Sequence, residues 1–184
     1  MRMYVKDSIR KVIDNINSLQ LALIQSGELN RDVIFPGFTH LQKAQPVLFS
    51  HHLLAYAEMF ERDKRRFEEC YHRTDVLPLG SGALAGVPYP IDRQFMADRL
   101  GFSSLSGNSM DAVSDRDFII DYLSAAAIAI MHISRLAEEI IIWTTEEFSF
   151  VKLPLEYTTG SSIMPQKRNP DFAELSRAKT GRIY

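Results

Sequence analysis

The stretch FIIDYLSAAAIAIMHI, residues 118–133, decides the fold, because polar residues interrupt its apolar run at very few positions. On a helical period it places apolar side chains on nearly all sides, so more than one neighbouring element must pack against it. The small residues at 124–127 allow another helix to approach closely. We therefore predict a helix over residues 115–149 at the centre of a multi-helix bundle. This length exceeds that of usual globular helices and favours an assembly.

Two more long helices are predicted upstream of this stretch. Residues 2–26 place apolar side chains at three- and four-residue spacing, and Gly27 is a plausible stop. Residues 46–75 repeat the pattern, with Pro46 at the first helical position. The order of these elements predicts an all-α fold, a long-helix bundle whose loops carry the functional residues.

The remaining elements are a short helix over residues 91–100 and another that begins at residue 170. We expect residues 1–184 to form a single helical domain. The first helical pattern has no cap before it and the last has no stop, so we also expect a chain truncated at both ends.

Composition excludes several classes of function. The 184 residues are 46% hydrophobic and carry a net charge of −2, with basic and acidic residues interleaved, so we expect no nucleic-acid partner. The most apolar run, between Asp121 and Arg135, is shorter than the roughly 20 residues that cross a bilayer, so we expect no membrane partner. Cys70 is the single cysteine, which excludes an internal disulfide and a thiolate metal cluster and fits a reducing compartment.

Several polar side chains have a structural interpretation. The charged run at 58–69 is typical of a solvated helix face with ion pairs between residues four apart. His51 and His52 are adjacent, so they point to different faces of a helix and cannot both bind one metal ion. We interpret both of them as structural or interface residues, and His132 as a satisfied core or interface histidine.

The loop with the most chemical content is GSSIMPQKRNPD, residues 160–171. Its glycine and serines give a mobile backbone whose amides can face a ligand. Lys167 and Asn169 add a cation and an amide, and Asn169 also precedes a proline and an acidic first turn, as an N-cap does. Such a loop suits an anionic substrate, but a surface loop before an ordinary helix start would look the same.

Two further residues have chemistry that local structure does not explain. A histidine ordinarily titrates near neutrality, so His40 can exchange a proton with a substrate, although it can equally be a polar loop residue. Ser114 and Asp117 have the spacing of a capping box, which explains both of them. Arg116 between them is not explained, and its guanidinium could pair with a substrate carboxylate.

These regions resemble the fumarase/aspartase superfamily, whose members are lyases that release fumarate. The resemblance to the family's signature loop is carried by Gly160-Ser161-Ser162-x-Met164-Pro165-x-Lys167-x-Asn169. A second superfamily region is similar to Thr39-His40-x-Gln42-x-Ala44-Gln45-Pro46. The loop variant with Gln166, Lys167 and Arg168, and the run at 108–117, most resemble the argininosuccinate lyase family.

The resemblance implies the reversible elimination of argininosuccinate to arginine and fumarate, without a cofactor or a metal. It implies that Ser161 is the base, with its pKa depressed by the loop amides and by Lys167. His40 would be the acid or the partner of the acid, and Glu174 would orient it. The same resemblance implies a set of substrate-binding residues, namely Thr39, Asn169, Arg116, Ser162 and Gln45.

The resemblance also implies a cytoplasmic homotetramer in which three subunits build each active site. Members of the family carry further site regions on both sides of the part that residues 1–184 match, so this chain alone is not expected to turn over at full rate. Three alternatives remain open. They are another fumarate-releasing lyase (adenylosuccinate lyase, fumarase or aspartase), a non-catalytic relative such as a lens crystallin, and an all-helical interaction module.

Overall fold

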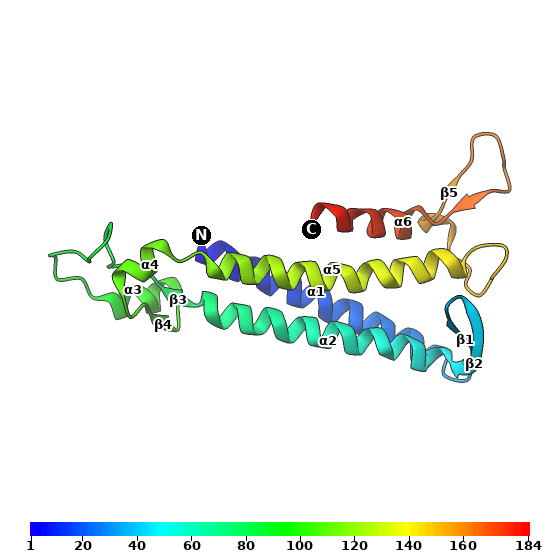
Figure 1. Cartoon of the computed structure of the whole chain (residues 1–184), viewed down its shortest axis with the longest axis horizontal. Coiled ribbons are helices and arrows are strands. Elements are labelled where there is room, and N and C mark those ends of the chain that lie inside the picture. Colours follow the sequence, from blue (N-terminus) through cyan, green and yellow to red (C-terminus); the bar gives the residue numbers. More distant parts are fainter. The chain divides into compact units, whose positions relative to one another are not determined.

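The computed structural model describes residues 1–184, and three long helices dominate it (Figure 1). These are α1 (Arg2–Leu29), α2 (Phe49–Thr74) and α5 (Asp117–Trp143). The shorter helical elements are α3 (Arg93–Leu100), α4 (Ser109–Ser114), α6 (Asp171–Ala178) and the 3-10 turns η1 (Leu155–Tyr157) and η2 (Lys179–Arg182). The predicted all-α class is confirmed. None of the helices combines the length and the apolar character needed to cross a membrane.

Strands occur only as three isolated pairs. The longest pair is the antiparallel hairpin of β1 (Ile34–Thr39) and β2 (Gln42–Leu48). The two short pairs are β3 (Val76–Leu77) with β4 (Ser104–Leu105), which is parallel, and β5 (Thr159–Gly160) with β6 (Arg168–Asn169), which is antiparallel.

The chain divides into two compact units. The first unit contains residues 1–22 and 61–125, and the second contains residues 23–60 and 126–184. Both divisions fall inside long helices, so α1, α2 and α5 each contribute one part to each unit.

In the first unit, the start of α1 lies beside the end of α2, which makes these two helices antiparallel. Lys6 forms an ion pair with Asp75, and an Arg2 guanidinium nitrogen lies 3.1 Å from the carbonyl oxygen of Thr74. The most deeply buried side chains of these two helices include Ile9, Phe67 and Cys70. Cys70, the single cysteine, is thus fully buried on α2.

The start of α5 differs from the prediction. Ser114 does not cap this helix; it is the last residue of α4, and its hydroxyl donates to backbone carbonyls of that helix. The reason is that Asn108 caps an extra helical turn, accepting from the amide of Met110 at 2.9 Å. The amide of Asp117, where α5 begins, is 2.8 Å from the carboxylate of Asp115. The predicted capping box is therefore wrong.

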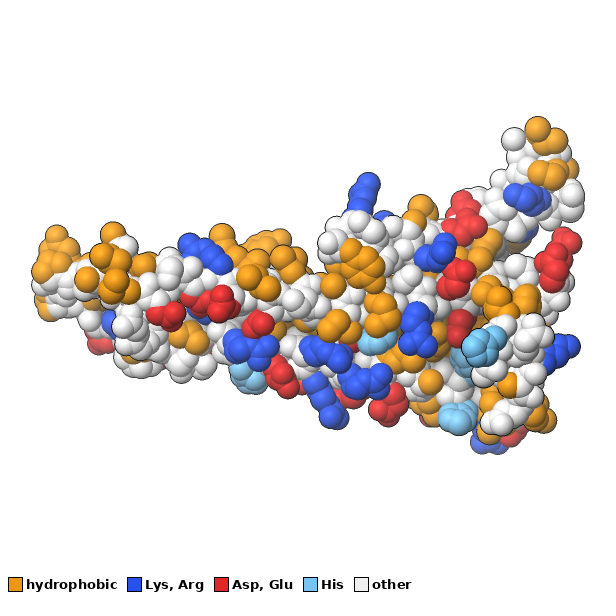
Figure 2. All heavy atoms as spheres, viewed as in Figure 1, with side chains coloured by type: hydrophobic (Ala, Val, Ile, Leu, Met, Phe, Trp, Pro, Cys, Tyr) orange, Lys and Arg blue, Asp and Glu red, His pale blue; other side chains and the backbone are white.

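The charged run on α2 behaves largely as predicted. Glu61 is paired with Lys64 at 2.5 Å and with Arg65 at 3.3 Å, at helical spacings of three and four residues. Asp63 differs, because it is fully buried and lies 2.9 Å from Arg66. Figure 2 shows basic and acidic side chains interspersed on the visible face rather than collected into one basic patch.

The second unit joins the first half of α2 to the second half of α5. His52 of α2 and Glu139 of α5 lie 2.6 Å apart, and His132 is buried with its ring edge toward Phe60. The predicted helix start at Pro46 is wrong. Pro46 lies in β2 opposite a proline of β1, and α2 begins at Phe49.

Two predicted helix ends also differ from the structure. Gly27 does not stop α1, which continues to Leu29. At the same end of the second unit, α5 stops at Trp143 rather than near residue 149, because the chain folds back on it. The amides of Phe150 and Val151 both donate to the carbonyl oxygen of Trp143, at 2.8 and 3.2 Å.

Candidate active site

The β1–β2 hairpin presents Thr39 and His40 at its tip. Thr39 pairs with Gln42, which leaves His40 and Leu41 as a two-residue turn with φ angles of 54° and 57°. Positive φ at both positions is typical of a type I′ turn, which normally contains Asn and Gly. Thr39, His40 and Gln45 are all exposed. The hairpin therefore holds the His40 imidazole in solvent, on a left-handed backbone conformation that residues other than glycine rarely adopt.

An aromatic cluster fixes the base of this hairpin to the helices of the second unit. Phe35 of β1 is buried, and its ring lies 5.1 Å from that of Trp143 and 5.0 Å from that of Phe150. Higher up the hairpin, the ring of Phe38 lies 5.6 Å from that of Phe148. These contacts connect the hairpin to the segment that leaves α5.

The signature loop closes at its base through a short strand pair. Thr159 lies opposite Asn169 in the β5–β6 pair, and the Thr159 hydroxyl donates to the Asp171 carboxylate at 2.5 Å. The loop that projects between the two strands is visible in Figure 1. Its ends are therefore held together, while the residues between them are mostly exposed.

Inside the loop, the Ser161 hydroxyl oxygen accepts two backbone amides. The amide nitrogens of Ile163 and Met164 lie 3.3 and 3.1 Å from it. A turn follows, in which the amide of Lys167 donates to the carbonyl oxygen of Met164 at 3.0 Å. Because N–H groups that point at an oxygen stabilise negative charge on it, this arrangement suits a serine that loses its proton.

The predicted helix start after the loop is only partly present. Asn169 lies in β6 and does not cap α6; Pro170 precedes the helix and provides no side-chain cap. The predicted acidic first turn is present, with Asp171 and Glu174. These carboxylates already occupy the positive end of the helix dipole, so Lys167 is the stronger attraction for an anion here.

The second unit contains every predicted site residue except Arg116. The hairpin enters α2 and the loop follows α5, and the two helices meet at His52 and Glu139, so both segments lie beyond the same end of the bundle (Figure 1). Glu174 and His40 are not joined by a hydrogen bond. Within this chain, no direct contact therefore supports the predicted role of Glu174 in orienting His40.

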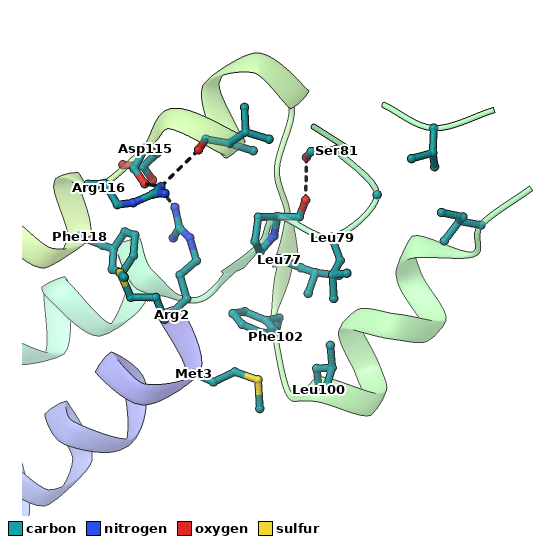
Figure 3. Close-up of a pocket in the computed structure, with 18 residues that line it drawn as sticks. Arg2, Met3, Leu77, Leu79, Ser81, Leu100, Phe102, Asp115, Arg116 and Phe118 are labelled. Atoms are coloured by element: carbon teal, nitrogen blue, oxygen red, sulfur yellow. Dashed lines mark hydrogen bonds and ion pairs between the residues drawn. The ribbon is translucent and has the colours of Figure 1, made fainter. Parts of the chain in front are cut away.

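Arg116 belongs to the first unit, where it lines a cavity of about 610 Å³ (Figure 3). The cavity walls are mainly apolar and include Leu77, Leu100 and Phe102. One Arg116 guanidinium nitrogen donates to the backbone carbonyls of residues 113 and 115, at 3.3 and 2.6 Å. Arg116 is thus turned onto its own loop, while the Arg2 ion pair with Asp115 lies beside it.

A polar cluster below the hairpin was not predicted from the sequence. Besides its contact with His52, Glu139 also hydrogen-bonds the buried Tyr56. Burial and the nearby Glu139 carboxylate raise the pKa of Tyr56 above its usual value of 10.0. The four-residue spacing of His52 and Tyr56 was a usable signal, but nothing in the sequence marks Glu139 as their partner. No group of three or more acidic, histidine or cysteine side chains is arranged to hold a metal ion.

A model of the lyase family matches residues 1–184, which is the whole chain. The chain belongs to the lyase family. Over all of its 184 residues, this lyase chain is 59% identical to argininosuccinate lyase from Dehalococcoides mccartyi and 55% identical to argininosuccinate lyase from Moorella thermoacetica. It spans 40% of the length of each of these relatives.

Solved structures of other lyases share the fold. EDDS lyase in complex with formate superposes with a TM-score of 0.96 at 32% identity, over 99% of this chain and 37% of that one. The fumarate lyase:delta crystallin from Brucella melitensis bound to cobalt gives 0.82 at 21% identity, over 99% of this chain and 42% of that one. The second likeness concerns the fold alone.

Proposed function

We propose that this lyase chain forms part of an argininosuccinate lyase, which splits argininosuccinate into arginine and fumarate. The observation that carries the proposal is the 59% identity to a curated argininosuccinate lyase over all 184 residues. The signature loop and the hairpin with Thr39 and His40 support it, because they carry the residues that the resemblance to the argininosuccinate lyase family assigns to the site. We further propose that residues 1–184 make up most of one central helical domain of that enzyme.

The reaction is an elimination, and it defines what the site must do. A base removes a proton from the carbon next to a carboxylate, and the electron pair left behind forms the double bond of fumarate. The bond from the neighbouring carbon to the guanidinium nitrogen breaks, and that nitrogen takes up a proton to give arginine. The proton removed is weakly acidic, so the carboxylate must be stabilised as charge develops on it.

Within this proposal Ser161 is the base. The amides of Ile163 and Met164 support the assignment, because they donate to its oxygen and would stabilise the alkoxide. Lys167 and Asn169 would hold the substrate carboxylate and take up its developing charge. Ser162 would add a polar contact from the same loop.

The hairpin would supply the second half of the chemistry. His40 would protonate the departing nitrogen or assist the group that does so, and Glu174 would orient its imidazole. Thr39 and Gln45 would contact the substrate, and Arg116 would bind a carboxylate in an active site shared between subunits. The elimination as written needs no cofactor.

A cytoplasmic homotetramer is part of the same proposal. The assembly is supported by large apolar side chains left exposed on α5, where Ile120 is 63% and Leu123 is 53% exposed. Light scattering on the complete protein, with Leu123→Lys as the interface variant, tests the assembly. A tetramer for the wild-type protein and a smaller species for Leu123→Lys are expected.

One experiment tests the activity. The complete reading frame that contains residues 1–184 is expressed, and fumarate absorbance is followed with argininosuccinate, adenylosuccinate, malate or aspartate as the substrate. Fumarate from argininosuccinate alone is expected, with a loss of at least about 100-fold in kcat for Ser161→Ala. The matched control Ser18→Ala changes an exposed helix serine and should keep full activity.

A second candidate, a lyase with a different substrate, is favoured by the TM-score of 0.96 to EDDS lyase. Fumarate released from another of the four substrates would select this candidate. No fumarate from any of them would contradict the proposed function.

A further inference from the structure

Arg2 of α1 holds the acidic neighbour of Arg116 in the first unit. The Arg2 guanidinium forms an ion pair with the Asp115 carboxylate, and the two side chains are only 10% and 20% exposed. The guanidinium also donates to the carbonyl oxygen of Thr74 at 3.1 Å and lies 4.4 Å from the centre of the Phe118 ring. The Arg2 side chain is therefore fixed between the end of α2 and the start of α5.

Both oxygens of the Asp115 carboxylate have partners. One oxygen pairs with Arg2, and the other accepts the amide of Asp117 at 2.8 Å. The neighbouring Arg116 has no carboxylate partner, because its guanidinium donates only to backbone carbonyls. Figure 3 shows Arg2, Asp115 and Arg116 together at the wall of the cavity. The positive charge of Arg116 thus remains available, although an acidic residue precedes it directly.

Without Arg2, the Asp115 carboxylate would be free to pair with Arg116. The two residues are consecutive, and the Arg116 guanidinium already lies 2.6 Å from the Asp115 carbonyl oxygen. A carboxylate paired with the planar guanidinium would occupy the same donors that a substrate carboxylate needs. Arg2 prevents this competition because it binds the carboxylate first.

We propose that Arg2 is a positioning residue that holds the Asp115 carboxylate and so keeps Arg116 available to a substrate carboxylate. The proposal rests on the proposed function, in which Arg116 binds such a group. Arg2 itself is not assigned contact with the substrate. All three residues belong to the first unit of one chain, so their pairing is independent of which subunits complete the active site around Arg116.

Steady-state kinetics of the complete protein with argininosuccinate test this role. Arg2→Gln keeps a donor for the Thr74 carbonyl but loses the charge that holds Asp115. It should raise KM about fivefold, the competition expected of a partly exposed ion pair, and change kcat less than twofold, because binding to Arg116 is lost equally in the ground state and the transition state. Arg2→Lys keeps the charge and should stay within twofold of the wild type. The matched control Arg10→Gln removes an exposed arginine of the same helix and should leave both constants unchanged.

Removal of the competing carboxylate separates this role from a purely structural one. Arg2→Gln/Asp115→Asn should return KM to within twofold of the wild type, because asparagine can still accept the Asp117 amide but carries no charge for Arg116. A residue that only stabilises the junction of the helices would show no such rescue. An unchanged KM in Arg2→Gln, or a KM that stays raised in the double variant, would overturn the proposal. Asp115→Asn alone should also keep KM within twofold, and a larger rise would reject the proposal even if Arg2→Gln did not fold.

Chemical modification keeps this proposal apart from the proposed function. Phenylglyoxal reacts with accessible guanidinium groups, so the rate at which it modifies Arg116, followed by peptide mass spectrometry, reports the pairing of Arg116 without any substrate. Modification should slow at least threefold in Arg2→Gln, recover in the double variant and stay at the wild-type rate in Arg10→Gln. If the wild-type protein releases no fumarate from any substrate, the proposed function fails, but these rates still decide whether Arg2 keeps Arg116 unpaired. Equal rates in Arg2→Gln and the wild type would then reject the role of Arg2 by themselves.

Discussion

Phe35→Ala is expected to release the hairpin that carries Thr39 and His40. The Phe35 side chain is 6% exposed, and its ring has four aromatic neighbours at centroid distances of 5.0 to 5.8 Å. Truncating a buried phenylalanine typically costs about 3–5 kcal/mol. Phe38, the other aromatic anchor of the hairpin, is only half-buried and cannot compensate. Most of the loss should therefore fall on local opening of the hairpin rather than on the whole protein.

Amide hydrogen exchange of residues 34–48 in the complete protein measures this opening. Since each 1.4 kcal/mol is a factor of about ten, a loss of 3 kcal/mol predicts exchange roughly 100-fold faster. Phe95→Ala is the matched control, because Phe95 on α3 is 61% exposed and should leave the hairpin unchanged. An acceleration below tenfold in Phe35→Ala would refute the reasoning that the aromatic cluster anchors the hairpin.

Three further predictions concern other parts of the chain. Burial raises the pKa of Asp75, but hydrogen bonds from Lys6 and Ser103, together with the Lys6 charge, outweigh this and hold the pKa below its ordinary 3.8. The contribution of the Asp75 carboxylate to the free energy of unfolding is therefore complete above about pH 4 and is lost as the pH falls through the lowered pKa, which denaturant titrations from pH 6 to 2 should show. Asp75→Asn leaves the Lys6 charge buried and unpaired, and it should cost about 3–5 kcal/mol at neutral pH. Gly82→Ala should destabilise the first unit by about 1–2 kcal/mol, measured by urea unfolding, because φ is +62° and the new methyl group would lie 2.5 Å from a carbonyl oxygen; an unchanged midpoint would contradict this. Thr159→Val removes the hydrogen bond to Asp171 at the base of the signature loop, worth about 1 kcal/mol, so exchange of residues 160–168 should accelerate roughly fivefold, and equal rates would argue against the hydrogen bond.

Local patterns determined most of the helices. The apolar spacing of residues 2–26 and 118–133 was sufficient because a helix buries one face at a fixed period, and that period can be read from neighbouring residues. The short helix near residues 91–100 was equally predictable, since Asp92 caps it and Gly101 ends it in a left-handed conformation. The chemical content of the loop at 160–171 was also evident, because the residues that carry it are contiguous.

The hairpin could not be predicted in the same way. Its turn consists of His40 and Leu41, neither of which favours positive φ, so the local signal for a type I′ turn is missing. Its strands form because Phe35 is buried against Trp143, a partner far away in the sequence. For the same reason Pro46 was assigned to a helix, although it lies in a strand.

The sequence by itself thus determined the all-α class, the membership of the lyase family that the loop and hairpin motifs suggest, and the residue types available for chemistry. Only the tertiary structure decided which of them lie together. It placed Ser161 and His40 beyond the same end of one unit, Arg116 in the other unit, and Glu139 against His52. The physical reason is that periodicity records which side of a helix is buried, whereas the partner on that side depends on the register in which distant segments pack.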